Sequence, residues 1–219
     1  VQGGAMAKLG KVLTRLDENL LPVHITPVFT SMVKAIASAL SEPNSSLLLQ
    51  LLEPGKTEKS LELLEETGYL FAPLVRNTFN PTIVHGGSGV NIIPSEIVLN
   101  CDMRLLPGFS AEDGIREVRE VIGNDAELEI VYYSPNNAQP DMGMFGTLAE
   151  ILHSADPEGI PIPYIMSGVT DARFFARLGI QTYGFLPMRF HSSDEYMQTI
   201  HAPNERIPVT ALEFGAESI

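Results

Sequence analysis

The chain has 219 residues, 44% of them hydrophobic and 19% charged, a composition typical of a globular protein with one large domain or two small ones. Its formal net charge of −13 argues against nucleic acid and anionic membranes as partners, and is compatible with metal cations or with plain solubility. Cys101 is the single cysteine, which excludes an intramolecular disulfide and a cysteine-rich zinc knuckle.

Helical periodicity dominates the first third of the chain. Apolar residues recur there at the spacing of one helix face, and the predicted helices run over Gly4–Leu16, Thr30–Leu40, Leu47–Leu52 and Lys59–Thr67. Two prolines between Leu20 and Pro27 indicate a short extended link. Thr30 or Ser31 is the predicted cap of the second helix, and Gly68 is predicted to close the last one.

From Asn77 the apolar period changes from helical to alternating. Strands are predicted over Thr78–His85, Glu96–Leu105 and Glu127–Tyr133, and a helix runs from Ser110 to Ile122. With the helix of Gly4–Leu16, this order makes three quarters of a ferredoxin-like split βαβ unit. The first strand of such a unit would lie before Val1.

The polar, proline-bearing stretch Ser134–Asp141 is the predicted domain boundary. After it, helices alternate with short strands, as in an α/β layer. The predicted elements are a helix at Phe145–Ser154, a strand at Tyr164–Met166, a helix at Asp171–Leu178 and a strand at Thr182–Phe185. We therefore expect one domain at residues 1–137, with a helical insertion at about 25–70, and part of a second at 138–219.

A glycine-rich hairpin carries the first candidate site residues. The glycines of residues 86–89 free the backbone for a tight turn, and Asn91 offers an amide beside it. Arg104, at the end of the next strand, has a planar guanidinium group that can donate two parallel hydrogen bonds to a carboxylate. A turn asparagine and a surface arginine without function would look the same, so these residues alone leave both interpretations open.

A second candidate lies between a predicted strand and a predicted helix. Gly168, Val169 and Thr170 lead into the helix, and Thr170 is a suitable N-cap. The free N–H groups of a helix start can bind an anion such as a substrate carboxylate. Most capped helices bind nothing, so a purely structural cap is the alternative.

A third candidate is the histidine-containing segment 191–206. His191 and His201 lie there among carboxylates, a combination that suits zinc. Because a lone histidine is usually not a ligand, composition alone does not choose between a metal role and a structural one. The remaining histidines lack such neighbours and are predicted to be structural or solvent-facing: His24, His85 and His153.

Taken in this order, the motifs resemble the dizinc peptidase and deacylase family, which includes glutamate carboxypeptidases, aminoacylases, acetylornithine deacetylase and succinyl-diaminopimelate desuccinylase. The segment GGSGVNIIPSEIVLNCDMRLLPG is similar to the lid, or dimerisation, domain of that family. The segments SGVTDARFFARLGIQTYGF and HAPNERI are similar to the closing part of its catalytic domain. The implied fold class is α+β followed by α/β: a ferredoxin-like lid with a helical insertion, then the C-terminal part of an α/β zinc-hydrolase domain.

Carried over residue by residue, the resemblance implies four roles. His201 matches the last metal ligand, which binds the second zinc. Asn91 matches a catalytic asparagine that approaches the reacting carbonyl and comes from the neighbouring subunit. Arg104 matches the arginine that holds the substrate carboxylate, and the loop at residues 168–170 matches one that lines the substrate site.

The family's other metal ligands, its general-base glutamate and a lid histidine would lie upstream of Val1. The resemblance therefore implies the second half of an enzyme that hydrolyses an amide next to a free carboxylate, in a small peptide or an N-acyl amino acid. Two zincs would occupy the complete site, with cobalt or manganese as possible substitutes, and this chain alone would hold metal weakly at most. A non-catalytic dimerisation or binding module is the alternative.

The resemblance also implies a homodimer that pairs through the lid. No stretch approaches the ~18 consecutive apolar residues of a membrane span, so a membrane is not an expected partner. The net charge of −13 makes nucleic acid an unexpected partner as well. We expect a cytoplasmic protein, and the sequence leaves open whether a targeting signal precedes Val1. The acyl group, the preferred side chain and the choice between peptidase and deacylase are left open by the sequence.

Overall fold

The computed structural model describes residues 3–134, 142–191 and 199–219. Its internal contacts divide the chain into two units: the first holds residues 1–140 and 164–173, and the second holds 141–163 and 174–219. The predicted domain boundary at residues 137 and 138 lies outside the described residues.

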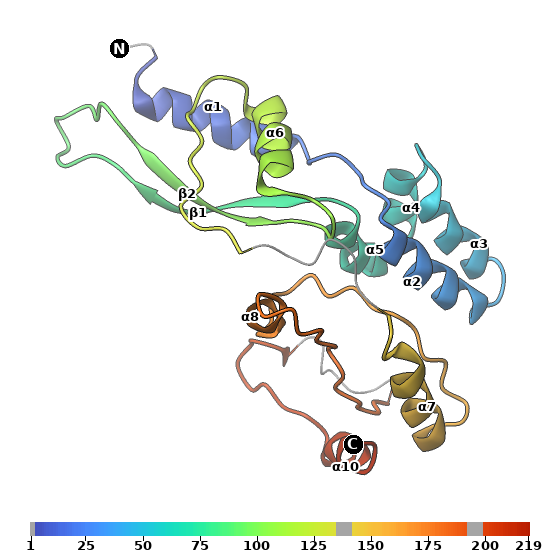
Figure 1. Ribbon diagram of the computed structural model, residues 1–219. Coiled ribbons are helices and arrows are strands. Elements are labelled where there is room, and N and C mark those ends of the chain that lie inside the picture. The colour runs from blue at the N-terminus through green and yellow to red at the C-terminus, as the bar shows by residue number, and fades with distance from the viewer. Residues whose placement is uncertain (1–2, 135–141, 192–198) are drawn as a thin grey trace. The chain divides into compact units, whose positions relative to one another are not determined.

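The lid core, which we define as α1 (Ala5–Glu18), β1 (Thr78–His85), β2 (Val98–Arg104) and α6 (Ala111–Ile122), is built as a two-stranded sheet with both helices on one face (Figure 1). The helices meet the sheet through apolar side chains that share one interior: Val12, Leu21, Phe79, Leu99, Met103, Val118 and Ile122. Gly114 allows the approach of α6, because a Cβ there would overlap the side chain of Met103. The helices and the hairpin predicted for this part of the chain are present.

The two strands pair antiparallel, from Thr78 opposite Arg104 to His85 opposite Val98. The register shifts between Pro81 and Ile83, where proline, which has no N–H for the ladder, is tolerated at a bulge. Alternate residues of β2 are exposed and half-buried, as expected for a sheet with one covered face. The exposed set includes Arg104.

The third predicted strand, Glu127–Tyr133, is not formed: these residues have no strand structure. Their alternating pattern is a strand pattern, but a strand forms only where a neighbour takes up its backbone N–H and C=O groups. In the described residues, no strand pairs with them. The ferredoxin-like arrangement is thus represented by the hairpin and two helices.

The helical insertion occupies residues 27–74 and lies beyond the end of the hairpin that carries Arg104 (Figure 1). Its elements are α2 (Pro27–Ser38), α3 (Asn44–Leu49), the 3-10 turn η1 (Gln50–Leu52), α4 (Thr57–Leu63), α5 (Glu66–Phe71) and the 3-10 turn η2 (Ala72–Leu74). They enclose their own apolar core, which includes Phe29, Met32, Val33, Leu48, Leu51, Phe71, Leu74 and Val75.

The prediction that Thr30 or Ser31 caps the second helix is wrong. α2 begins at Pro27, and the hydroxyl of Thr26 accepts a hydrogen bond from the N–H of Phe29. Thr30 and Ser31 lie in the first turn, where their hydroxyls donate to carbonyls one turn earlier. A threonine N-cap followed by proline at the first helical position is a favourable start, so the helix begins before the predicted cap.

The helix predicted over Lys59–Thr67 is two helices, α4 and α5, which are separated by a break at Glu65 with φ of 49°. Gly68 does not close a helix but lies inside α5, and a Cβ there would overlap the carbonyl oxygen of Leu61. The glycine therefore permits the close approach of α5 to α4. A sequence pattern does not distinguish this role from that of a helix terminator.

The second unit contains α7 (Phe145–Ala155) and α10 (Val209–Glu217). The division between the two units falls inside α8 (Ala172–Ala176), after Arg173. The predicted strands at Tyr164–Met166 and Thr182–Phe185 are not formed, because the described chain supplies no pairing partner for either one. Gly179, with φ of 71°, follows the turn after α8, a left-handed conformation that glycine adopts without strain.

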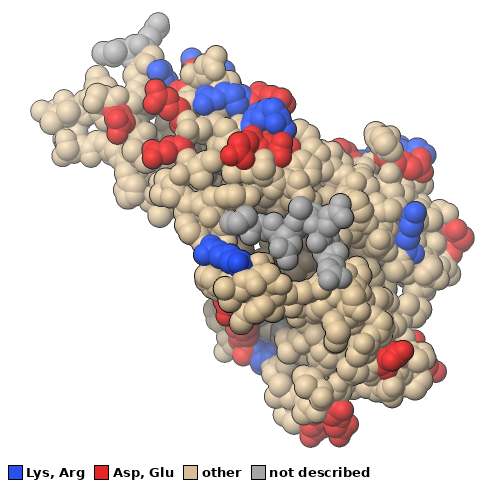
Figure 2. Space-filling model, viewed as in Figure 1, with Lys and Arg blue, Asp and Glu red and all other residues tan. Residues whose placement is uncertain are grey.

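Charged side chains are unevenly spread over the surface. Figure 2 shows acidic and basic groups mixed over α1 and α6, whereas the visible face of the second unit is mostly uncharged.

Among the described helices, none has both the length and the apolarity needed to cross a membrane.

Candidate functional site

Arg104 is the last residue of β2 and lies on the solvent face of the hairpin. Its Nε donates a hydrogen bond to Oδ2 of Asp102 at 2.6 Å, and the two side chains are 42% and 48% exposed. Residues two apart on a strand point to the same face, so the pair stands opposite the helices. The carboxylate holds one edge of the guanidinium, and the Nη groups are the donors that remain for a ligand.

Asn91 lies in the turn at the other end of the same hairpin and is exposed. The turn is closed by the N–H of Ile92, which donates to the carbonyl of Gly89. Six residues of β2 separate the two ends, or roughly 20 Å at the usual strand rise. The structure therefore does not bring Asn91 and Arg104 together within one protomer.

The loop of Gly168, Val169 and Thr170 belongs to the first unit, and Val169 is exposed. The hydroxyl of Thr170 accepts a hydrogen bond from the N–H of Ala172 at 3.3 Å. This bond lies just before α8, which begins at Ala172 and is only five residues long, so Asp171 and not Thr170 immediately precedes the helix.

His201 is exposed in a turn of the second unit and has a left-handed backbone, with φ of 60°. The N–H of Ala202 donates to the carbonyl of Thr199 across this turn. The loop at residues 168–170 belongs to the other unit.

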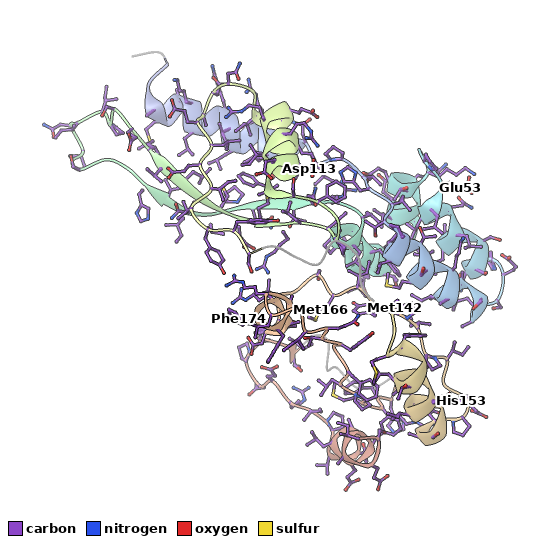
Figure 3. All side chains as sticks on the ribbon, in the orientation of Figure 1. Glu53, Asp113, Met142, His153, Met166 and Phe174 are labelled. Atoms are coloured by element: carbon purple, nitrogen blue, oxygen red, sulfur yellow. The ribbon has the colours of Figure 1, made fainter. Side chains whose placement is uncertain are left out.

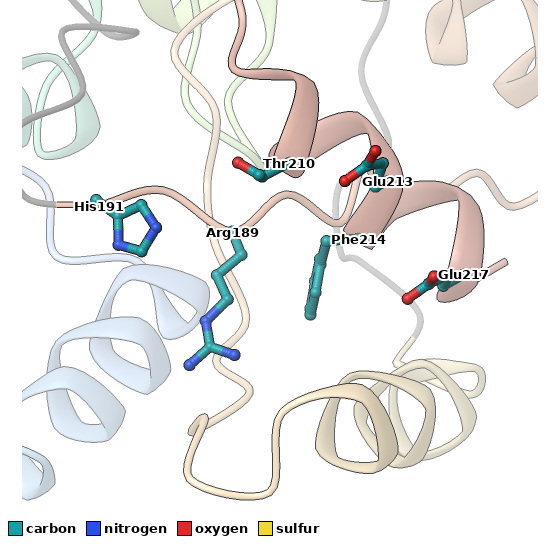
Figure 4. A pocket seen from close by; sticks show the side chains of 6 residues that line it. All are labelled: Arg189, His191, Thr210, Glu213, Phe214 and Glu217. Atoms are coloured by element: carbon teal, nitrogen blue, oxygen red, sulfur yellow. The ribbon is translucent and has the colours of Figure 1, made fainter.

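The rival histidine, His191, lines a cavity of about 220 Å³ in the second unit (Figure 4). Cationic and acidic side chains surround this cavity together with one phenylalanine: Arg189, His191, Thr210, Glu213, Phe214 and Glu217. Of the residues considered for a site from the sequence, only His191 contributes to it. The sequence pattern left a metal role and a structural role open for His191, and it did not predict this cavity.

Zinc takes three protein ligands in a catalytic site and four in a structural site. Across residues 3–134, 142–191 and 199–219, no three histidine, cysteine or acidic side chains gather closely enough to hold an ion. The described residues of this chain therefore do not make a zinc site by themselves, and His201 would be one ligand among several supplied from elsewhere.

Two titratable groups of the lid core have shifted pKa values with evident causes. Burial raises the pKa of Cys101, in agreement with an inert thiol. At the start of α6 (Figure 3), the pKa of Asp113 falls to about 2 because it accepts hydrogen bonds from the Ser110 backbone and from Arg116. Both groups belong to the scaffold.

A largely buried polar network at the base of the hairpin could not be foreseen from the sequence pattern. Nε2 of His24 lies 2.7 Å from Oε1 of Glu117, and Nδ2 of Asn77 donates to Oε2 of the same carboxylate at 2.9 Å. Beside it, Arg76 pairs with Glu58 at 2.6 Å. The one available signal was Glu117 itself, an acidic residue on the buried face of an amphipathic helix.

Three comparisons with known proteins bear on this site. The family model described as "Peptidase dimerisation domain" matches residues 2–128. The chain is 27% identical over 217 residues to an N-fatty-acyl-amino acid synthase/hydrolase of Bos taurus, a match that covers 94% of the chain and 41% of that protein. It is 28% identical over 140 residues to a probable carboxypeptidase S-like protein of Dictyostelium discoideum, covering 62% of the chain and 27% of that protein.

The chain thus spans less than half the length of these curated relatives. No solved structure matches it.

Proposed function

The chain belongs to the metallopeptidase and deacylase family through its peptidase dimerisation domain at residues 2–128, and on this premise we propose that it is part of a hydrolase that cleaves an amide next to a free carboxylate. The family membership confirms the resemblance predicted from the motifs. We assign the lid to residues 1–137 and the closing part of the catalytic domain to 138–219. The rest of the catalytic domain would come from a longer protein.

The observation that carries the proposal is the placement of Arg104. It stands on the uncovered face of the hairpin, and Asp102 holds one edge of its guanidinium at 2.6 Å. A guanidinium group oriented in this way is suited to bind a carboxylate through two parallel hydrogen bonds. The relatives' names, a hydrolase of N-fatty-acyl amino acids and a carboxypeptidase-like protein, describe substrates that carry such a group.

In the proposed reaction, the residues of this chain bind and orient the substrate. Arg104 holds the free carboxylate, the loop at residues 168–170 lines the substrate site, and Asn91 donates its amide N–H to the carbonyl oxygen in the site of the neighbouring subunit. The family is generally metal-dependent; bound zinc would activate the attacking water. Among the described residues, His201 is the one proposed to hold that metal.

The test uses the full-length protein and the change Arg104→Ala. We expect a loss of roughly tenfold to a hundredfold in kcat/KM for an N-acyl amino acid, because a charge-assisted pair contributes about 1.5–3 kcal/mol. The corresponding N-acyl amino acid amide, which lacks the charge, should lose much less. Arg116→Ala is the matched control, since Arg116 is also an exposed arginine paired with an aspartate at 2.6 Å. Equal losses on both substrates would contradict the proposal.

A non-catalytic dimerisation module is the second candidate. It is favoured by the family of residues 2–128 and by the described sheet, which has only two strands and so leaves both outer edges available for pairing. Metal content and amide hydrolysis by the full-length protein separate the two candidates. A protein that dimerises, binds no metal and hydrolyses no N-acyl amino acid or dipeptide would favour the module.

A further inference from the structure

We propose that Asn77 and Glu117 are positioning residues that fix the base of the β1–β2 hairpin and, through it, the location of Arg104. The inference rests on the proposed function, since it concerns the arginine that binds the substrate carboxylate. Neither residue touches that site, and each acts through the backbone on which Arg104 stands.

The Asn77 side chain continues the ladder beyond its last residue pair. The ladder ends where Thr78 lies opposite Arg104, and Asn77 comes one residue before Thr78. Its Oδ1 accepts a hydrogen bond from the N–H of Leu106 at 2.8 Å, two residues after Arg104. Arg104 is therefore fixed on both sides: by its pairing with Thr78 and by the bond between Asn77 and Leu106.

The other half of the same amide is bound to α6. Nδ2 of Asn77 donates to Oε2 of Glu117 at 2.9 Å, while Oε1 of Glu117 lies 2.7 Å from Nε2 of His24. Asn77 is 1% exposed and Glu117 is 6% exposed. An amide buried to this degree is costly to leave without partners, so its orientation is determined by the bonds it makes.

One carboxylate thus joins three segments of the first unit: the link that leads into the helical insertion, the start of β1, and α6. The N–H of His24 also donates to the carbonyl of Val75 at 2.6 Å, which closes the two ends of the insertion on each other. The outer half of the hairpin is less buried, because β1 is exposed beyond Phe79. Arg104 lies at the supported end.

The experiment is a double-mutant cycle in the full-length protein, with Asn77→Ala, Arg104→Ala and the combination. If Asn77 acts through Arg104, Asn77→Ala should raise KM for an N-acyl amino acid about fivefold to tenfold when Arg104 is present, and less than about twofold when Arg104 is already alanine, because coupled residues are not additive. The KM of the uncharged amide substrate and kcat should change little in either background.

Thr82→Val is the matched control. It removes a hydrogen bond of the same hairpin, from the Thr82 hydroxyl to the Asn100 carbonyl at 3.1 Å, but in the exposed half. We expect no change in KM. If Asn77→Ala does not fold, as judged by circular dichroism, Glu117→Gln serves instead, since it keeps the shape and weakens the bonds to Asn77 and His24.

The outcomes separate the two hypotheses. If Arg104→Ala lowers activity equally on charged and uncharged substrates, the proposed function fails. If Arg104→Ala is selective for the charged substrate but Asn77→Ala has the same effect in both backgrounds, the function stands and the positioning role is overturned.

Discussion

At the residue scale, His201 combines a predicted metal role with an unusual backbone. Its φ of 60° is a left-handed conformation that histidine adopts more readily than most residues and glycine adopts freely. Alanine at such a position is strained by roughly 1–2 kcal/mol. An alanine substitution therefore changes the turn and removes the imidazole at the same time, whereas glycine only removes the imidazole.

We predict that His201→Gly in the full-length protein lowers the occupancy of one zinc and reduces turnover severely, while the melting temperature and the dimer are preserved. His201→Ala should have the same effect on metal content and an additional cost in stability. Metal analysis and calorimetry provide the measurements, and His191→Gly is the control. If removal of His191 empties a metal site and removal of His201 does not, the assignment of this loop is wrong.

A second prediction concerns the start of α6. The Ser110 hydroxyl accepts from the Asp113 N–H while the Asp113 carboxylate accepts from the Ser110 N–H, a reciprocal capping box. Because the pKa of Asp113 is lowered from 3.8 to about 2, the ionised carboxylate stabilises the folded state above pH about 4. This contribution is lost as the pH falls toward 2.

Asp113→Asn should therefore lower the free energy of unfolding at neutral pH, and the difference from the natural protein should shrink as the pH falls from about 4 to about 2. Urea unfolding followed by circular dichroism at a series of pH values measures it. Glu112→Gln removes the same charge from the same helical turn without touching the capping box. An equal, equally pH-dependent effect of that control would show that general charge, and not the cap, is responsible.

At the element scale, the close packing of α5 against α4 depends on Gly68 having no side chain. Gly68→Ala would force a Cβ into the carbonyl oxygen of Leu61, which belongs to backbone and cannot rotate away. We predict a loss of about 1–3 kcal/mol in unfolding free energy. Gly10→Ala is the matched control, because Gly10 lies inside α1 with open space around its missing Cβ; there alanine should stabilise by about 0.5–1 kcal/mol.

Both changes are measured by urea or thermal unfolding. Similar effects of Gly68→Ala and Gly10→Ala would mean that α5 can move away from α4 at little cost. The helical insertion would then be a loose attachment to the lid and not a packed module with its own core.

At the scale of the whole molecule, we predict a homodimer that forms through the lid. The family of residues 2–128 and the two-stranded described sheet support it, and twofold pairing is the commonest form of homo-oligomer. Sedimentation velocity of the full-length protein should show a dimer at micromolar concentration that dissociates only on strong dilution. A monomer throughout the micromolar range would contradict both the dimer and the proposed contribution of Asn91 to the neighbouring site.

Helix periods, the hairpin and its glycine-rich turn, the polar turn at Thr170 and the family motifs could all be predicted from the sequence. These features depend on residues close together in the chain: the 3.6-residue period of α1 and α6, the alternation of β1 and β2, and the hydrogen bond that Thr170 accepts two residues on. Arg104 and His201 could be nominated for the same reason, because each belongs to a short motif.

Only the tertiary structure decided which predicted strands formed and which polar residues met. Glu127–Tyr133 has a strand pattern without a pairing partner in the described chain, and a strand is completed only by a neighbour's backbone. The carboxylate of Glu117 reaches Asn77, 40 residues away, and His24, 93 residues away. No local pattern encodes such contacts, because they arise when α6 packs on the sheet and brings distant side chains into one largely buried cluster, where polar groups require partners.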